Sequence, residues 1–342
     1  MRVIEVLAPG LLTTVQDLGR EGFGPLGVSP SGAADPIALR IGNRLVGNAE
    51  SAAALEMTLL GGTFLFPEGA LAALTGSDFG AALDGAELPR WTSFEVQPGQ
   101  TLRLGPTRSG ARCYLCTQGG IVVKPFLGSA STHLLSGLGG YEGRALRKGD
   151  VLKMGPGIPA CYSNRGFSTN RSQKVTPKIQ ERLLPHKVLR VTTGPQSAWF
   201  SRAAEKVLYG GTYHVSEEAN RMGLRLHGPP LPEGAHGGMI SEGVSLGAVQ
   251  IASGGMPIIL FVEQQTTGGY AKMANVISAD LSSVGQLRPR DVIRFERVTF
   301  ETARKLWMEQ EKLLASKDLI VEATGDVVRS LHNTRYRKRI LK

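Results

Sequence analysis

Cysteine and tryptophan are scarce in this chain, and long hydrophobic runs are missing. The 342 residues include only three cysteines and three tryptophans. A small, odd number of cysteines argues against a disulfide framework and is typical of a reducing cytoplasm. No apolar stretch approaches the roughly 18 residues that a membrane-spanning helix needs. The first residues carry charge within their apolar run and lack a small-residue cleavage site, so they do not predict a secretory signal.

Motifs that would assign chemistry directly are also absent. The sequence has no GxxxxGK[ST] phosphate loop, so nucleotide chemistry is expected to need another chain. Its histidines show no HxH or HxxxH spacing, so no metal site is expected. Cys113 and Cys116 form a CxxC, but within a predicted strand and without a following helix to lower a thiol pKa.

Two other matches are misleading. Residues 243–247 spell the GxSxG of a nucleophile elbow, but an elbow needs a helix after the serine, and residues 248–251 read as a strand. Lys153-Met154 and Lys272-Met273 only half resemble the tetrapeptide around a biotinylated lysine. We therefore expect no covalently bound cofactor.

The net charge of +10 is concentrated in two segments. Residues 165–190 carry +6 and residues 303–342 carry +5, so the remaining chain is nearly neutral. Nucleic-acid binders usually place basic residues on a folded face, and no recognition motif is visible. The composition thus predicts neither a nucleic-acid nor a membrane partner.

Short apolar segments bounded by glycine or proline recur at intervals of roughly ten residues, a spacing typical of β-barrels and sandwiches. The 44 glycines fit many tight turns. A chain of this length predicts two domains, and the polar, basic stretch after Tyr162 is the best boundary. We expect a mainly β fold with a few helices, in which residues 1–162 form the first half, 163–186 a basic linker, 187–300 the second half, and 301–342 a helix and basic tail.

Three helices are predicted. The first has Asp35 as N-cap, Pro36 at its first position and Gly47 as its end signal. The second is expected over Ala198–Leu208. The third, over Glu301–Ala315, is amphipathic and highly charged.

The segment Thr266-Thr267-Gly268-Gly269-Tyr270 after the apolar run Ile258–Val262 is the most informative feature. Adjacent glycines permit positive φ and a close approach of ligand to backbone N–H groups, while hydroxyls and a phenol supply further donors. A hairpin whose tight turn needs Gly-Gly is the simpler alternative.

Other polar, glycine-rich clusters occur along the chain. They include residues 13–20, 29–35, 220–223 and 240–243. Each has a simple structural explanation, with Asp17 and Ser31 as turn formers, Arg221 as a surface ion-pair residue and Glu242 as a strand-end carboxylate.

Taken together, these clusters match a known family in order and spacing. The matching blocks are TTVQDLGR at 13–20, GNRLVGN at 42–48, LGS.ST at 127–132, GGYEGRAL at 139–146, NRMG at 220–223, ISEGV at 240–244 and QTTGGY at 265–270. The chain resembles the family of allophanate hydrolase subunit 2 and the C-type subunit of 5-oxoprolinase, which also includes half of the carboxyltransferase region of urea carboxylase and an antagonist of a sporulation-kinase inhibitor. The resemblance covers about residues 1–300 and implies two cyclophilin-like β-barrel domains in tandem.

The resemblance implies one component of a heteromeric enzyme. It implies ATP-dependent hydrolysis of the 5-oxoproline lactam, or biotin-dependent carboxyl transfer to urea-like amides, together with a partner of the subunit-1 or subunit-B type. ATP or carboxybiotin would then be supplied through partner subunits. The alternative is a non-catalytic protein that sequesters a kinase-inhibitor-like partner.

The resemblance also implies roles for individual residues. Substrate binding is assigned to Ser31, Gln265, Thr266, Thr267, Gly268, Gly269 and Tyr270, whose donors would hold an oxyanion or carboxylate. Arg221 would pair with a carboxylate, because a guanidinium fork suits that geometry. Asp35, Glu242 or Glu263 would accept an amide N–H or act as the catalytic base.

Overall fold

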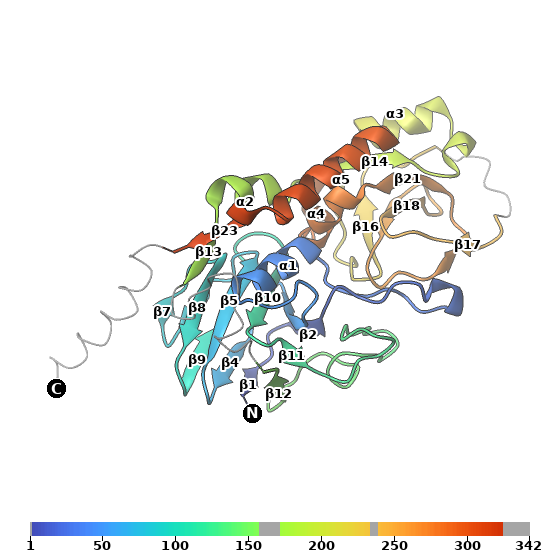
Figure 1. Ribbon diagram of the computed structural model, residues 1–342. Helices are drawn as coiled ribbons and strands as arrows, with labels where there is room; N and C mark the ends of the chain where they lie inside the picture. The colour runs from blue at the N-terminus through green and yellow to red at the C-terminus, as the bar shows by residue number, and fades with distance from the viewer. Residues whose placement is uncertain (1, 157–171, 233–238, 324–342) are drawn as a thin grey trace. The chain divides into compact units, whose positions relative to one another are not determined.

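The computed structural model describes residues 2–156, 172–232 and 239–323 (Figure 1). The described residues are mainly β, with five α-helices. Compact packing divides the chain into two units, one of Met1–Leu18, Pro36–Arg182 and Ser316–Lys342, the other of Gly19–Asp35 and Leu183–Ala315. The basic tail that the sequence predicts lies after residue 323, outside the described residues.

The first unit contains two seven-stranded sheets. One has the strand order β11-β12-β1-β4-β9-β6-β7, with bounds β1 Val3–Ala8, β4 Thr63–Phe66, β6 Ala82–Leu83, β7 Ala86–Glu87, β9 Gln100–Arg103, β11 Ile121–Val122 and β12 Val151–Met154. The other has the order β2-β3-β10-β5-β8-β13-β23, with bounds β2 Leu12–Gln16, β3 Ala54–Thr58, β5 Ala70–Gly76, β8 Thr92–Val96, β10 Arg112–Thr117, β13 Gln173–Val175 and β23 Ile320–Glu322. Their inward side chains, such as Phe64, Phe66 and Phe94, form one fully buried core.

Helix α1, Pro36–Leu45, packs against β5 and β10 of this unit. It begins at the predicted proline, and Gly47 follows its end with a left-handed φ of 75°. A side chain at Gly42 would place its Cβ 2.6 Å from Cys116 Sγ, so glycine is needed where the helix meets β10. Both Cys113 and Cys116 are buried in β10, and burial raises the pKa of Cys113 to about 12.

The second unit contains a closed barrel in the strand order β14-β21-β18-β19-β16-β15-β22. Its strands are β14 Val188–Thr193, β15 Tyr213–Val215, β16 Gly223–His227, β18 Ala248–Ile251, β19 Pro257–Leu260, β21 Lys272–Val276 and β22 Val292–Arg297. Tyr213, Phe261 and Phe295 lie in its buried core, and the rings of Tyr213 and Phe295 are 5.7 Å apart. With this barrel and the two sheets above, the predicted mainly β fold is confirmed.

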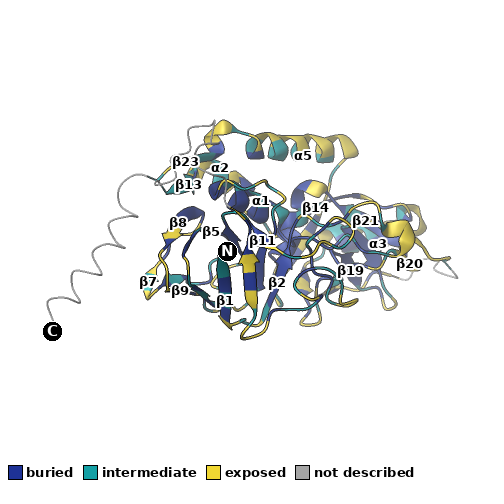
Figure 2. Cartoon of the chain, turned by 60° about the horizontal axis from the view of Figure 1, so that its bottom comes forward, coloured by how far each residue is buried: buried dark blue, intermediate teal, exposed yellow. Residues whose placement is uncertain are grey.

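The remaining helices are α2 Pro177–Leu183, α3 Arg202–Gly210, α4 Leu281–Gly285 and α5 Phe300–Leu314. The helix predicted over 198–208 is instead a 3-10 turn, Ser197–Trp199, followed by α3, because Ser201 caps α3 by accepting a hydrogen bond from Ala204 N–H. Helix α5 matches its predicted range within a residue and exposes most of its surface (Figure 2). Among the described helices, none is long and apolar enough to cross a membrane.

Residues 19–35 belong to the second unit, although the sequence placed them in the first half. Long-range hydrogen bonds explain this difference. Ser29 Oγ donates to Val262 O at 3.0 Å, and Gln286 Nε2 donates to Asp35 Oδ2 at 2.7 Å. The carbonyl of Ala34 passes so close to α4 that a Cβ at Gly285 would lie 1.9 Å from it.

The predicted linker also differs from what the structure describes. Residues 163–171 lie outside the described residues, but Gln173–Val175 form β13, which pairs with β23 and, through Lys174, with Thr92 of β8. Helix α2 follows two residues later. Because β13 and β23 complete a sheet of the first unit, part of the predicted linker belongs to the fold of that unit.

Candidate functional site

The Thr266–Tyr270 segment forms one side of a two-stranded ribbon in the second unit. Strand β20, Thr267–Gly268, pairs antiparallel with β17, Glu242–Gly243, in the register Glu242↔Gly268 and Gly243↔Thr267. Neither Gly268 nor Gly269 has positive φ, so the predicted positive-φ backbone and the tight Gly-Gly turn are both wrong. The two predicted clusters at 240–243 and 265–270 are thus brought together by strand pairing.

Packing, and not backbone conformation, restricts the size of the residue at position 268. A Cβ at this position would lie 2.6 Å from Nε2 of Gln250, a buried residue of β18. At Gly269 the nearest atom to a Cβ would be Ser241 Oγ at 3.4 Å, an ordinary contact. The first glycine therefore lets the ribbon lie directly on the barrel.

The ribbon presents most of the predicted binding residues to solvent. Gln265, Thr267, Gly269 and Tyr270 are exposed, and Thr266 is half-buried. Their hydroxyl and amide groups are therefore accessible to a ligand. Gly268 is buried, and its role in ligand contact stays a prediction.

Glu242, at the start of β17, faces two donors. Lys272 Nζ of β21 lies 2.6 Å from its Oε1, and Gln196 Nε2 donates to the same oxygen at 2.7 Å. The Lys272 ammonium, followed by the Gln196 amide, lowers the pKa of the Glu242 carboxyl from its ordinary value. Glu242 is therefore a carboxylate at neutral pH, and as a base it would have to act from within an ion pair.

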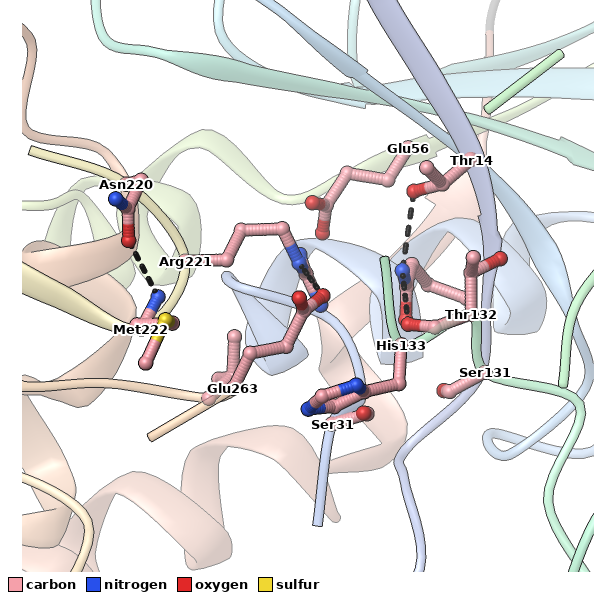
Figure 3. A network of polar contacts seen from close by, with 12 residues as sticks. Thr14, Ser31, Glu56, Ser131, Thr132, His133, Asn220, Arg221, Met222 and Glu263 are labelled. Atoms are coloured by element: carbon pink, nitrogen blue, oxygen red, sulfur yellow. Dashed lines mark hydrogen bonds and ion pairs between the residues drawn. The ribbon is translucent and has the colours of Figure 1, made fainter. Parts of the chain in front are cut away.

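Arg221 and Glu263 form a buried ion pair, visible at the centre of Figure 3. Their side chains are 4% and 3% exposed, so the interpretation of Arg221 as a surface residue is wrong. Arg221 Nη2 also donates to Gly32 O at 2.7 Å, which ties the 29–35 segment to this unit. Both predicted site residues thus have firm structural partners.

Ser31 and Asp35 lie in the same buried segment. Ser31 has φ of 54° and accepts a hydrogen bond from Arg20 Nη1 at 3.1 Å. Asp35 is 3% exposed and accepts from Gln286. These contacts show what positions the two residues, and their predicted substrate roles stay predictions.

Lys272 and Gln196 were missed by the sequence interpretation. Lys272 is 3% exposed, and Gln196 is 7% exposed. The one usable signal was a lysine within the apolar run Ala271-Lys272-Met273-Ala274, since lysine is rarely fully buried without a reason. Gln196 precedes a 3-10 turn and carries no comparable pattern.

A separate polar cluster lies in the first unit and joins two of the matching blocks. Asp17 Oδ1 accepts from Ser129 Oγ at 2.7 Å and from Ser131 Oγ at 2.5 Å, and Oδ2 accepts from Ala130 N–H at 2.6 Å. Gln16 Nε2 donates to Thr132 O at 3.2 Å and to Thr14 Oγ1 at 3.0 Å, and Figure 3 labels these two acceptor residues. These contacts fix the 129–132 loop against β2.

The chain is mainly β, with a closed barrel and a polar ribbon built from these motifs. The family model "Carboxyltransferase domain, subdomain A and B" matches residues 26–297, and the chain belongs to this family. The resemblance inferred from the motifs is confirmed.

Similar proteins fall into two groups. The chain is 36% identical to the C-type subunit of 5-oxoprolinase from Escherichia coli over 312 residues, which cover 91% of this chain and 96% of that protein. It is also 36% identical to urea amidolyase of Saccharomyces cerevisiae over 92% of this chain, but it spans only 18% of that protein. The crystal structure of Kluyveromyces lactis urea carboxylase matches 95% of this chain and 31% of that one, with 32% identity and a TM-score of 0.82.

Proposed function

We propose that this chain is a subunit of a heteromeric amide-processing enzyme that opens the 5-oxoproline lactam in an ATP-dependent reaction. The observation that carries the proposal is the alignment with the C-type subunit of 5-oxoprolinase, which extends over 96% of that protein. The urea enzymes match over a small part of their length, so carboxyl transfer to a urea-like amide is the second form of the same proposal.

The partner is a subunit-1 or subunit-B type protein. Nucleotide binding is assigned to partner subunits, because this sequence has no phosphate loop of the common type. ATP supplies the driving force for opening the ring, and this chain supplies groups that bind and orient the lactam. In the carboxyl-transfer form, carboxybiotin would be supplied in the same way.

The chemistry needs donors more than a nucleophile. Attack on a planar amide places negative charge on its oxygen, and one well-placed donor is worth about 3 kcal/mol of barrier. The exposed groups of Thr267 and Tyr270 lie on the ribbon, beside the Glu242 strand. We assign the binding of the substrate's amide oxygen to the donors of this ribbon.

Arg221 and Glu263 are better assigned as positioning residues. Their mutual ion pair and the bond to Gly32 hold the segment that carries Ser31 and Asp35. Glu242, which is about half exposed, is the more accessible of the three candidate carboxylates. It is therefore our choice for an acceptor of an amide N–H.

The test is reconstitution with a subunit-B type partner. The complex is supplied with ATP and 5-oxoproline, and glutamate is measured. We expect Thr267→Val to lower turnover at least tenfold, and Ser253→Ala, in an exposed turn outside the ribbon, to leave it unchanged. Unchanged turnover in Thr267→Val would refute the assignment.

A non-catalytic binding protein is the alternative, favoured by the internal pairing of Arg221 with Glu263. It requires a stable complex with a kinase-inhibitor-like partner. Under this alternative, no glutamate forms with any partner subunit, and ribbon substitutions alter complex formation alone.

A further inference from the structure

One oxygen of Glu242 occupies a position at which two donors from the barrel meet. Lys272 Nζ, at 2.6 Å, and Gln196 Nε2, at 2.7 Å, both contact Oε1. An ammonium and a fixed amide N–H converging on one oxygen are what a carboxylate or oxyanion of a ligand requires. Within the second unit, the Glu242 carboxylate thus occupies an anion-binding position formed by Lys272 and Gln196.

Lys272 is held inside the barrel wall, whereas its counter-ion is not. The lysine side chain is 3% exposed and the Glu242 side chain 46% exposed. Among the described residues, the Lys272 ammonium makes no hydrogen bond of good geometry beyond this ion pair. Burying an ammonium is costly without a close anion, so this position demands one.

Gln196 is oriented by the backbone of Lys272. Its Oε1 accepts from Lys272 N–H at 3.1 Å, and its backbone N–H donates to Lys272 O at 3.2 Å. Because the oxygen of the amide is engaged by a backbone donor, the NH₂ group must point toward Glu242. The donor pair is therefore fixed in place before any ligand arrives.

Glu242 sits on a much less constrained element. Strand β17 has two residues and pairs only with the two-residue β20 among the described strands, and both of its residues are exposed. A two-residue pairing has few hydrogen bonds to break. The Glu242 carboxylate can leave without disturbing the barrel, provided another anion takes its place.

We propose that Lys272 and Gln196 bind the carboxylate of an anionic amide substrate, and that Glu242 is the internal anion which the substrate displaces. The inference rests on the proposed function and narrows its substrate class to small amides or lactams that carry a carboxylate. The exchange leaves no buried charge unpaired, because one carboxylate replaces another on the same donors. A neutral amide cannot make this exchange.

The test measures binding to the full chain by isothermal titration calorimetry. The probe is L-5-oxoproline, and 2-pyrrolidinone serves as the matched lactam without a carboxylate. We expect Lys272→Met to weaken 5-oxoproline binding at least tenfold, whereas Glu242→Gln strengthens it several-fold because the competing charge is removed. Lys272→Met should leave binding of 2-pyrrolidinone unchanged, because that lactam has no carboxylate for the lysine to bind.

The opposite signs separate this proposal from a purely structural ion pair. If the pair only stabilised the fold, both substitutions would weaken binding alike. Lys187→Met is the matched control, because Lys187 forms a 2.7 Å pair with Asp291 but is 57% exposed. Should Lys272→Met fail to fold, Glu242→Gln still decides the question, since its side chain is accessible.

Three results would overturn the proposal. They are 5-oxoproline binding that is insensitive to Lys272→Met, weaker binding in Glu242→Gln, and no binding by either the unaltered chain or Glu242→Gln. Failure of the proposed function is distinguishable. In that case the binding changes appear as described, while the reconstituted complex produces no glutamate.

Discussion

Arg221 and Glu263 are each other's counter-ions inside the second unit, and neither is more than 4% exposed. Breaking such a pair leaves one buried charge without compensation, at a cost of about 3–5 kcal/mol. We expect Arg221→Met to lower the free energy of unfolding by about that amount, measured by urea denaturation. Arg290→Met, which breaks the exposed pair with Glu217, should change it by less than about 1 kcal/mol. Equal effects in the two variants would contradict this account.

Alanine substitutions at Gly268 and Gly269 form a matched pair that tests how the ribbon packs on the barrel. Gly268→Ala places a methyl group 2.6 Å from buried Gln250 Nε2, and overpacking of this kind costs about 1–3 kcal/mol. Gly269→Ala meets only an ordinary contact. Thermal unfolding should therefore separate the two variants, and a larger loss for Gly269→Ala would show that the ribbon does not lie on Gln250.

Asp17 holds the 129–131 loop through two serine hydroxyls and one backbone N–H. Asp17→Asn weakens the charge-assisted bonds and leaves a buried group poorly paired, at a cost of about 2 kcal/mol. Urea denaturation measures the loss. Amide hydrogen exchange should show faster exchange at Ala130 in particular, and unchanged protection there would refute the role assigned to Asp17.

His186 gives the stability of the second unit a predictable pH dependence. Its hydrogen bond with Asp280 raises the pKa of His186 above its ordinary value of 6.5, while partial burial and nearby Arg190 oppose the shift. A raised folded-state pKa means that this stabilisation is complete below pH 6.5 and is lost as pH rises through the folded-state pKa. Urea denaturation between about pH 6 and 9 should show the decline.

The control for this prediction is His186→Gln, which removes the titrating group but retains a donor toward Asp280. Burial acts to raise the pKa of Asp280, but the hydrogen bonds from His186 and Arg190 outweigh it and hold that pKa below its ordinary value. Asp280 therefore stays charged throughout the tested range. The variant should lose the decline, and a decline of the same size would assign it to another group.

Local patterns predicted the mainly β character of the chain and two of its helices well. Most of the run Ile258–Val262 lies in β19, Pro257–Leu260, and helix α1 starts at Pro36 because proline is favoured at a first helical position. The pairing of residues 19–35 with the second unit could not be predicted in this way. Its contacts, Arg221 with Gly32 and Gln286 with Asp35, join residues 189 and 251 positions apart.

The candidate site was predicted only in part, because its long-range contacts also cannot be read from local patterns. The Gly-Gly and Glu242 clusters were found as motifs, but their pairing as β20 and β17 depends on the fold. Lys272 was overlooked because an apolar strand pattern does not say which side chain finds a counter-ion. Gln196 is placed by hydrogen bonds to the backbone of Lys272. Such bonds cannot be predicted from the spacing of residues in the sequence.

The membership of Gly19–Asp35 in the second unit affects how this protein can be divided by experiment. A fragment that starts at Lys187 would contain every barrel strand. It would lack residues 19–35, which accept hydrogen bonds from Arg221 and Gln286. Supplying residues 19–35 as a separate peptide should restore folding of such a fragment. The amino-terminal segment would then complete the second unit without being covalently joined to it.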